Sequence, residues 1–155
     1  MGQMIKQIKP PTIWESLRER FFTREGDTPR MFSEIDYYRL QGLLTRQHLG
    51  AFAAFTVQLQ QLRRMLGRGL LYRCKDIPGN LVTMNSVVRL RSRRGTAFTI
   101  GLVYPRDADR RQRKVSVLST LGLALIGKAE GDFVSQNMAI EQILYQPESL
   151  GNYYI

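Results

Sequence analysis

The feature of this chain that most constrains its fold is a change in the spacing of apolar residues near residue 80. Before that point, apolar residues recur at intervals of three and four, which is the spacing of one helix face. After it, they alternate with polar residues, which is typical of strands buried on one side. A chain of 155 residues is long enough to bury a modest core. The sequence therefore predicts an α+β fold, with helices first and a sheet after them.

Residues 1–30 predict an N-terminal extension that contains one short helix. Thr12 and Glu15 have the spacing of a capping box, and apolar residues at helical intervals follow to about Phe22. Turn-forming residues up to Pro29 then form a linker. Such a helix either docks on the body of the protein or serves as a partner-binding arm, and the sequence leaves both open.

Residues 31–76 predict a short antiparallel helical hairpin. Ser33 and Asp36 can cap the first helix, and the connection at 47–50 is short enough to place the two helices antiparallel. The apolar seam follows coiled-coil spacing and comprises Tyr37, Leu40, Leu44 and Gln47 in the first helix and Phe52, Phe55, Leu59, Leu62 and Leu66 in the second. An ordinary helix pair packed on a core would show the same spacing.

Residues 77–155 predict a small antiparallel sheet with one short helix laid against it. Val88 and Leu90 alternate with arginines, and a second strand with one apolar face follows a turn at 92–95. Residues 114–119 predict a third strand. Ser119 can then cap a short helix that stops at Gly127. Residues 131–137 and 140–146 predict two further strands.

The segment 106–114 is densely charged, with five basic and two acidic residues in nine. Because predicted strands flank it, we expect a hairpin tip that carries these charges. The tip either addresses a charged partner or is a solvated loop, whose exposed ion pairs contribute ~0–1 kcal/mol each. Asp107 and Asp109 form a D-x-D pair, but the flanking cations disfavour a bound metal.

The formal net charge of +10 favours encounter with polyanions, either nucleic acid or an acidic protein surface. The apolar run at 49–57 is far short of the ~20 residues of a membrane span. The N-terminal sequence lacks the apolar region of a secretory signal, and the single cysteine, Cys74, excludes an internal disulfide. We expect a cytoplasmic protein with no membrane contact.

Catalytic chemistry is not indicated by the residue inventory. The single histidine, His48, lies at the predicted hairpin tip, so neither a His-paired nucleophile nor a His-rich metal site is expected within one chain. Neither a Walker-type motif nor a dinucleotide fingerprint occurs. We expect no enzymatic activity, no catalytic residues, no cofactor, no metal and no small-molecule substrate.

Four segments in a fixed order carry a family resemblance: "IPGNLVTMNSVVRLR", "LVYPRDAD", "VSVLSTLGLALIGKAEGD" and "YQPESLGNYYI". Together they resemble the regulator of nucleoside diphosphate kinase (Rnk) family of the Gre-factor superfamily, over roughly residues 30–155. The resemblance implies an N-terminal antiparallel coiled coil and a C-terminal domain of FKBP-like fold over residues 77–155. It also implies a partner, because the C-terminal domain of Gre factors grips the rim of the RNA polymerase secondary channel.

Three departures from the family pattern affect these expectations. In Gre factors, acidic residues at the coiled-coil tip help to hold the catalytic metal for transcript cleavage, whereas the tip here, "LTRQHLGAF", contains no carboxylate. We therefore expect no cleavage stimulation. The block expected to read S-P-L-G lacks its proline, and the last hairpin is several residues shorter than in relatives.

The resemblance assigns polymerase binding to the loop and its surroundings, namely Tyr104, Arg106, Asp107, Asp109, Arg110 and Ser119, with Arg46, Gln47 and His48 at the hairpin tip. The alternative is a basic nucleic-acid-binding module, in which a phosphate-tracking stripe is formed by Arg89, Arg91, Arg93, Arg94, Arg111 and Arg113. Peptidyl-prolyl isomerase activity is suggested only by analogy with the FKBP-like fold.

Overall fold

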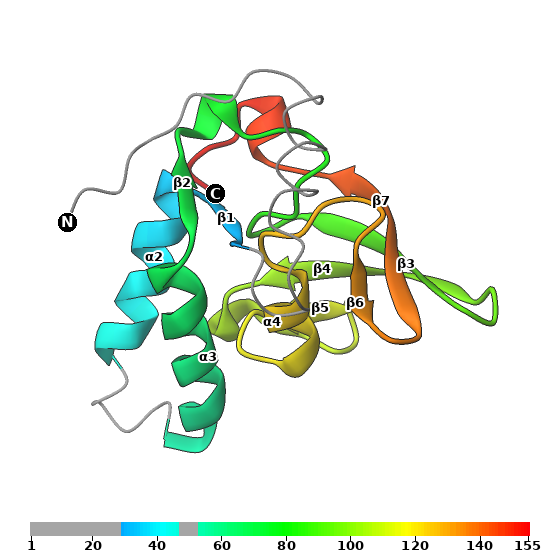
Figure 1. Cartoon of the computed structure of the whole chain (residues 1–155), viewed down its shortest axis with the longest axis horizontal. Helices are drawn as coiled ribbons and strands as arrows, with labels where there is room; N and C mark the ends of the chain where they lie inside the picture. Colours follow the sequence, from blue (N-terminus) through cyan, green and yellow to red (C-terminus); the bar gives the residue numbers. More distant parts are fainter. Residues whose placement is uncertain (1–28, 47–52) are drawn as a thin grey trace.

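The computed structural model describes residues 29–46 and 53–155 (Figure 1). The predicted N-terminal helix therefore lies outside the described residues, as do the tip residues Gln47 and His48. No helix among the described residues is long and apolar enough to cross a bilayer. The chain forms a mixed helix and sheet fold, in which two helices occupy one end and a sheet occupies the other (Figure 1).

The two helices predicted from periodicity are α2 (Glu34–Thr45) and α3 (Thr56–Gly67), which lie side by side (Figure 1). α2 begins as expected, because Ser33 Oγ accepts a hydrogen bond from the Asp36 N–H at 3.2 Å. The helices bury the seam positions Leu40, Leu44, Leu59, Leu62 and Leu66, together with Leu43. Phe55 was predicted in the seam but precedes α3 in a 3-10 turn (Ala53–Phe55), and 37% of its surface is exposed.

The sequence did not predict the pairing that closes the helical segment at its base. β1 (Met31–Ser33) pairs in parallel with β2 (Leu70–Tyr72), so the strand before α2 lies beside the strand after α3. A 3-10 turn (Cys74–Asp76) then leads toward the sheet. These three-residue strands are too short to show a period in the sequence.

The main sheet has the order β5-β4-β3-β7-β6. Its strands are β3 (Val87–Ser92), β4 (Ala97–Val103), β5 (Lys114–Ser116), β6 (Phe133–Ser135) and β7 (Met138–Tyr145). The predicted β3–β4 hairpin is present, with Val88 and Leu90 buried and Arg89 and Arg91 exposed. The β6–β7 hairpin is also present, with a short first strand and a tight turn.

One part of the sheet prediction is wrong, because β5 pairs with β4 in parallel and the sheet is mixed. After Val103 the chain turns through a 3-10 segment (Pro105–Asp107) and runs back before Lys114 pairs beside Gly101. The segment 106–113 is consequently a return loop at the edge of β4. It does not join antiparallel strands at a hairpin tip.

The single helix of the sheet region is α4 (Thr120–Leu125). Ser119 Oγ accepts a hydrogen bond from Gly122 N–H at 2.9 Å, which is the predicted N-cap. The helix ends before Gly127, whose φ of 75° suits glycine. From outside the helix, the Arg30 guanidinium donates to the Ile126 carbonyl at 2.7 Å and so satisfies a C-terminal acceptor.

The two predicted segments, 31–76 and 77–155, share one hydrophobic core. The largest fully buried side chains of this cluster include Phe32, Leu40, Leu62 and Leu66 from the helical segment and Met84, Leu90, Leu102, Leu118, Leu125 and Ile126 from the sheet segment. The sequence left open a coiled-coil hairpin and an ordinary helix pair packed on a core. Because α2 and α3 contribute to the shared core, they form the second of these.

Candidate functional site

The charged return loop folds back on itself in a tight turn. Asp109 and Lys114 exchange two backbone hydrogen bonds, of 3.1 and 2.8 Å, and so close a loop of four residues. The Asp109 carboxylate accepts from the Arg111 N–H at 2.8 Å, and Arg113 adopts a positive φ of 55°. The carboxylate of Asp109 therefore stabilises the backbone that presents the arginines of this loop.

This turn forms one wall of a groove of about 560 Å³. The groove lies between the return loop, strands β4 and β5, and the start of α4. Its apolar residues are Phe98, Ile100, Ala108, Val115 and Leu121, its cations are Arg110, Arg113 and Lys114, and its hydroxyls are Ser116 and Ser119. An apolar lining with cations along it can bind an apolar side chain whose neighbours are acidic.

Within residues 29–46 and 53–155, the three cations of the groove have no paired carboxylate. Arg110, Arg113 and Lys114 are exposed, and none makes an ion pair with another residue of the described chain. An external acidic partner would therefore gain an interaction without first displacing an internal one.

Ser119 lines the groove, but its hydroxyl already serves the local structure. It donates to the Ser116 carbonyl at 2.6 Å and accepts from Gly122 N–H. The sequence prediction placed Ser119 in the binding set, and the structure adds that its side chain sets the start of α4. The shape of the groove at this end therefore depends on the cap.

The remaining predicted binding residues do not line the groove. Arg106 and Asp107 are exposed beside each other, with a separation of 3.6 Å between guanidinium and carboxylate. Tyr104 is half-buried, and its hydroxyl donates to Asp36 Oδ1 at 3.2 Å. Of the residues predicted for polymerase binding, Arg110 and Ser119 both line the groove. Asp109 stabilises the turn that carries Arg110.

Asp36 is a buried carboxyl group that the sequence prediction assigned only to helix capping. It lies at the junction of α2, the 83–86 turn and the end of β4, and Oδ2 accepts from Met84 N–H at 2.9 Å. Burial, reinforced by the charge of Glu148, raises the pKa of Asp36 from 3.8 to about 7. No spacing signal in the sequence separates such a residue from a solvated first-turn acid.

This junction joins two of the segments that carry the family resemblance. Asn85, within "VTMNS", donates its N–H to the Leu102 carbonyl at 2.7 Å, within "LVYP". Thr83 of the same turn donates its hydroxyl to Glu148 Oε2 at 2.6 Å. Burial and the neighbouring Asp36 charge also raise the pKa of Tyr104. Met84 and Tyr104 of these motifs thus hold α2 against the sheet through Asp36.

The arginines of the nucleic-acid alternative are divided between the two faces of the sheet. Arg89 lies opposite Thr99, on the exposed face, whereas Phe98 and Ile100 of the groove lie on the other face of β4. Arg113 lines the groove and so lies apart from Arg89. A single stripe does not unite the six arginines.

Two of these arginines are also paired with a carboxylate of the protein. The Glu141 carboxylate on β7 pairs with Arg89 at 3.0 Å and with Arg91. Arg93 and Arg94 lie exposed in the β3–β4 turn, and Arg111 is exposed in the return loop. Arg46, from the predicted hairpin tip, is exposed at the C-cap of α2.

Comparisons with known proteins point to one group. Residues 77–145 match the family described as "Transcription elongation factor, GreA/GreB, C-term". The "Regulator of nucleoside diphosphate kinase" of Escherichia coli strain K12 is 28% identical over 134 residues, covering 81% of this chain and 96% of that protein. The "Transcription elongation factor GreA" of Desulfovibrio desulfuricans is 28% identical over 140 residues, covering 86% of each chain.

A solved structure, "Prokaryotic transcription elongation factor GreA/GreB from Nitrosomonas europaea", is similar in both sequence and fold. It is 33% identical, with a TM-score of 0.63, and the match covers 75% of this chain and 99% of that one. The described helices and sheet thus follow an arrangement already seen in that protein.

Proposed function

This chain belongs to the GreA/GreB family of transcription elongation factors, and we propose that it is a regulator that binds RNA polymerase near the secondary channel without stimulating transcript cleavage. Family membership supports a role in transcription. The binding surface and the missing cleavage activity rest on the residues of this chain.

The groove beside the return loop is the observation that carries the binding proposal. Its apolar residues, including Leu121, would accept an apolar side chain from the polymerase, and Arg110 and Arg113 would meet acidic groups around it. A buried apolar anchor with charges at its rim is the arrangement in which interface binding energy concentrates. We place the polymerase contact here.

The absence of cleavage stimulation is proposed from the position of the acidic residues in the helical segment. Between Thr45 and Phe55 the sequence contains no carboxylate, so the predicted tip offers no anionic ligand to a metal. The acids of α2, Glu34 and Asp36, lie in its first turn, at the opposite end of a 12-residue helix. That separation is roughly 15 Å or more at helical rise.

The test is binding of labelled protein to core RNA polymerase at several salt concentrations, with a GreA protein as competitor. We expect saturable binding that the competitor displaces. Leu121→Glu and Arg113→Glu should each weaken binding by about tenfold or more, because they place a charge in the groove or reverse one. Arg106→Glu is the matched control, since Arg106 is equally cationic but lies outside the groove.

Two results would contradict the proposal. Failure of the protein to bind polymerase at low salt would remove the function, and equal losses for Arg113→Glu and Arg106→Glu would remove the groove as the site. Binding to nucleoside diphosphate kinase, which the description of the relatives names, is measured in the same assay. Cleavage in stalled elongation complexes should remain at its background rate.

A further inference from the structure

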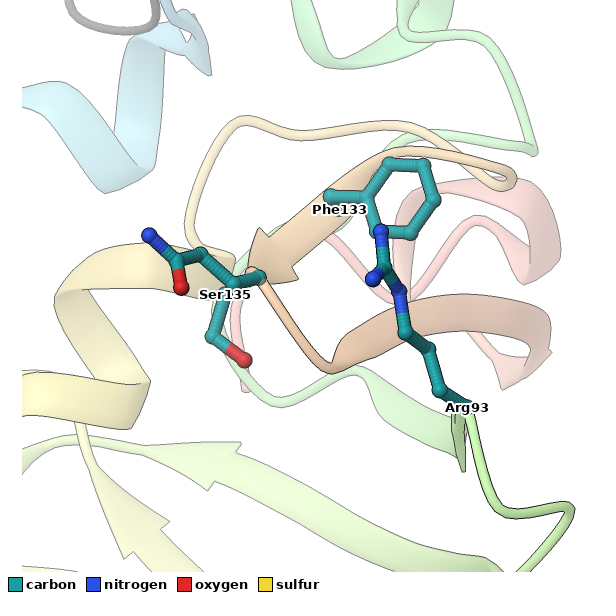
Figure 2. A pocket seen from close by; sticks show the side chains of 4 residues that line it. Arg93, Phe133 and Ser135 are labelled. Atoms are coloured by element: carbon teal, nitrogen blue, oxygen red, sulfur yellow. The ribbon is translucent and has the colours of Figure 1, made fainter.

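A second, smaller pocket lies away from the groove, where the β3–β4 turn meets the β6–β7 turn (Figure 2). Its volume is about 300 Å³, and it is lined by Arg93, Phe133, Ser135 and Gln136. We call it the Arg93–Phe133 pocket. This volume lies at the lower end of the ~300–1,000 Å³ typical of small-ligand sites.

Phe133 presents an aromatic ring to solvent in this pocket. The residue begins the edge strand β6, and 52% of its surface is exposed. Its backbone is nevertheless well held, because its carbonyl accepts from Lys128 Nζ at 2.5 Å and it pairs with Ala139 of β7. The ring is therefore an exposed apolar surface on a fixed support.

Arg93 brings a cation to the same pocket. Its N–H donates to the Asn137 carbonyl at 2.9 Å, which ties the β3–β4 turn to the β6–β7 turn. Its side chain extends toward the Phe133 ring (Figure 2). The guanidinium makes no hydrogen bond or ion pair with any residue in the described part of the chain.

The neighbouring arginines of β3 show that this arrangement differs from an ordinary charged surface. Arg89 and Arg91 share the carboxylate of Glu141, so one of their two positive charges is balanced within the protein. Arg93 has no such carboxylate, and Arg94, also exposed, follows it in the turn. Arg93 therefore brings a cation without a paired carboxylate of the described chain to the exposed ring.

We propose that the Arg93–Phe133 pocket binds one nucleotide unit of single-stranded nucleic acid, with the base stacked on Phe133 and a backbone phosphate bound by Arg93. Aromatic rings bind unpaired bases by stacking, and arginines bind the backbone. The side chains of Ser135 and Gln136 provide hydrogen-bonding groups for the base edge or sugar. Arg94, the next and exposed residue of the turn, would meet an adjacent phosphate.

The chemistry of the pocket favours a single strand over other polyanions. A duplex keeps its bases stacked inside the helix and offers no free face to Phe133, and a peptide of acidic residues alone would use the cation but not the ring. Binding at this pocket is independent of the polymerase groove, because the two sites share no lining residue.

The test measures fluorescence anisotropy of a short labelled oligouridylate and of an abasic strand with the same number of phosphates, without polymerase. The full chain should bind the base-bearing strand about tenfold more tightly than the abasic one, since stacking contributes ~1–3 kcal/mol per base. Phe133→Ala and Phe133→Leu should remove that preference. Arg93→Gln should weaken both strands and lower the slope of log K against log salt by about one.

Arg89→Gln is the matched control, because it removes an arginine of the adjoining strand β3 that is already paired with Glu141. It should leave the preference for the base-bearing strand unchanged. Equal affinity for the two strands, or an unchanged preference in Phe133→Ala, would overturn the proposal. Thermal unfolding of each variant checks that the fold is intact, and polymerase binding by the same variants separates failure of this site from failure of the groove.

Discussion

Replacement of Asp36 by asparagine should change how the stability of this protein depends on pH. The buried carboxyl group has its pKa raised from 3.8 to about 7, with burial as the main cause and the charge of Glu148 as the second. An acid whose pKa is higher in the folded state binds its proton more tightly there than in the unfolded chain. Its contribution to stability is therefore fully present below pH 4 and is lost as the pH rises through 7.

The size of the effect follows from the two pKa values. A difference of roughly three pH units, at 1.36 kcal/mol per unit, corresponds to about 4 kcal/mol of unfolding free energy lost between pH 4 and pH 8. Asparagine has nearly the same shape and cannot ionise. Its Oδ1 can still accept from Met84 N–H, and its amide can donate to the Tyr104 oxygen.

The assay is urea unfolding of the wild type and Asp36→Asn at steps from pH 4 to pH 8. The free energy of unfolding of the wild type, relative to the variant, should fall by about 4 kcal/mol across this range. Asp107→Asn is the control, since its side chain is about half exposed and its profile should remain parallel to the wild type. Parallel profiles for wild type and Asp36→Asn would refute the reasoning.

Other substitutions test the packing of the fold through the free energy of unfolding. Gly122→Ala should cost several kcal/mol or prevent folding, because a Cβ there would lie 2.0 Å from the Ser116 carbonyl oxygen. Gly42→Ala has no atom within 4 Å of its new Cβ and should stabilise α2 by about 0.5–1 kcal/mol; destabilisation would show that this site is crowded. Ser119→Ala should cost about 1 kcal/mol through loss of the α4 N-cap, and an unchanged midpoint in urea would contradict that role. Leu62→Ala should cost roughly 2–5 kcal/mol because the side chain is fully buried, and a loss below about 1 kcal/mol would mean that the helices do not share the core.

Local signals predicted the elements that depend on neighbours in the chain. Ser33 and Ser119 begin their helices, and Gly127 follows the end of α4 with a positive φ. The alternation of Val88 and Leu90 with arginines correctly gave the buried face of β3. Capping and alternation act over a few residues, so each can be recognised without knowledge of the rest of the fold.

Long-range pairing was not available from those signals. β1 pairs in parallel with β2, which follows both helices in the chain, and β4 pairs in parallel with β5, which follows the return loop. β1, β2 and β5 have three residues each. A strand period constrains which side chains share a face, but not the direction of the partner strand. For this reason the return loop was mistaken for a hairpin tip, although its charge was evident.

Some residues of the candidate site could be found from the sequence, and others only from the structure. The sequence drew attention to the charged loop, and Arg110 and Ser119 line one groove with Leu121 and Phe98. It missed these apolar partners, because their role depends on where β4, β5 and α4 meet. It also missed Phe133, which reads in the sequence as an ordinary strand residue and becomes notable only by its exposure beside Arg93.

The sequence by itself determined the family, the helix-then-sheet order, the excess of positive charge and the absence of carboxylates near the helical tip. Only the tertiary structure decided which charges are balanced and which are free. Glu141 pairs with Arg89 and Arg91 because β7 pairs with β3, while Arg93, in the β3–β4 turn, has no ion pair among the described residues. Charge is a property of composition, but its availability to a partner is set by distances between residues far apart in the chain.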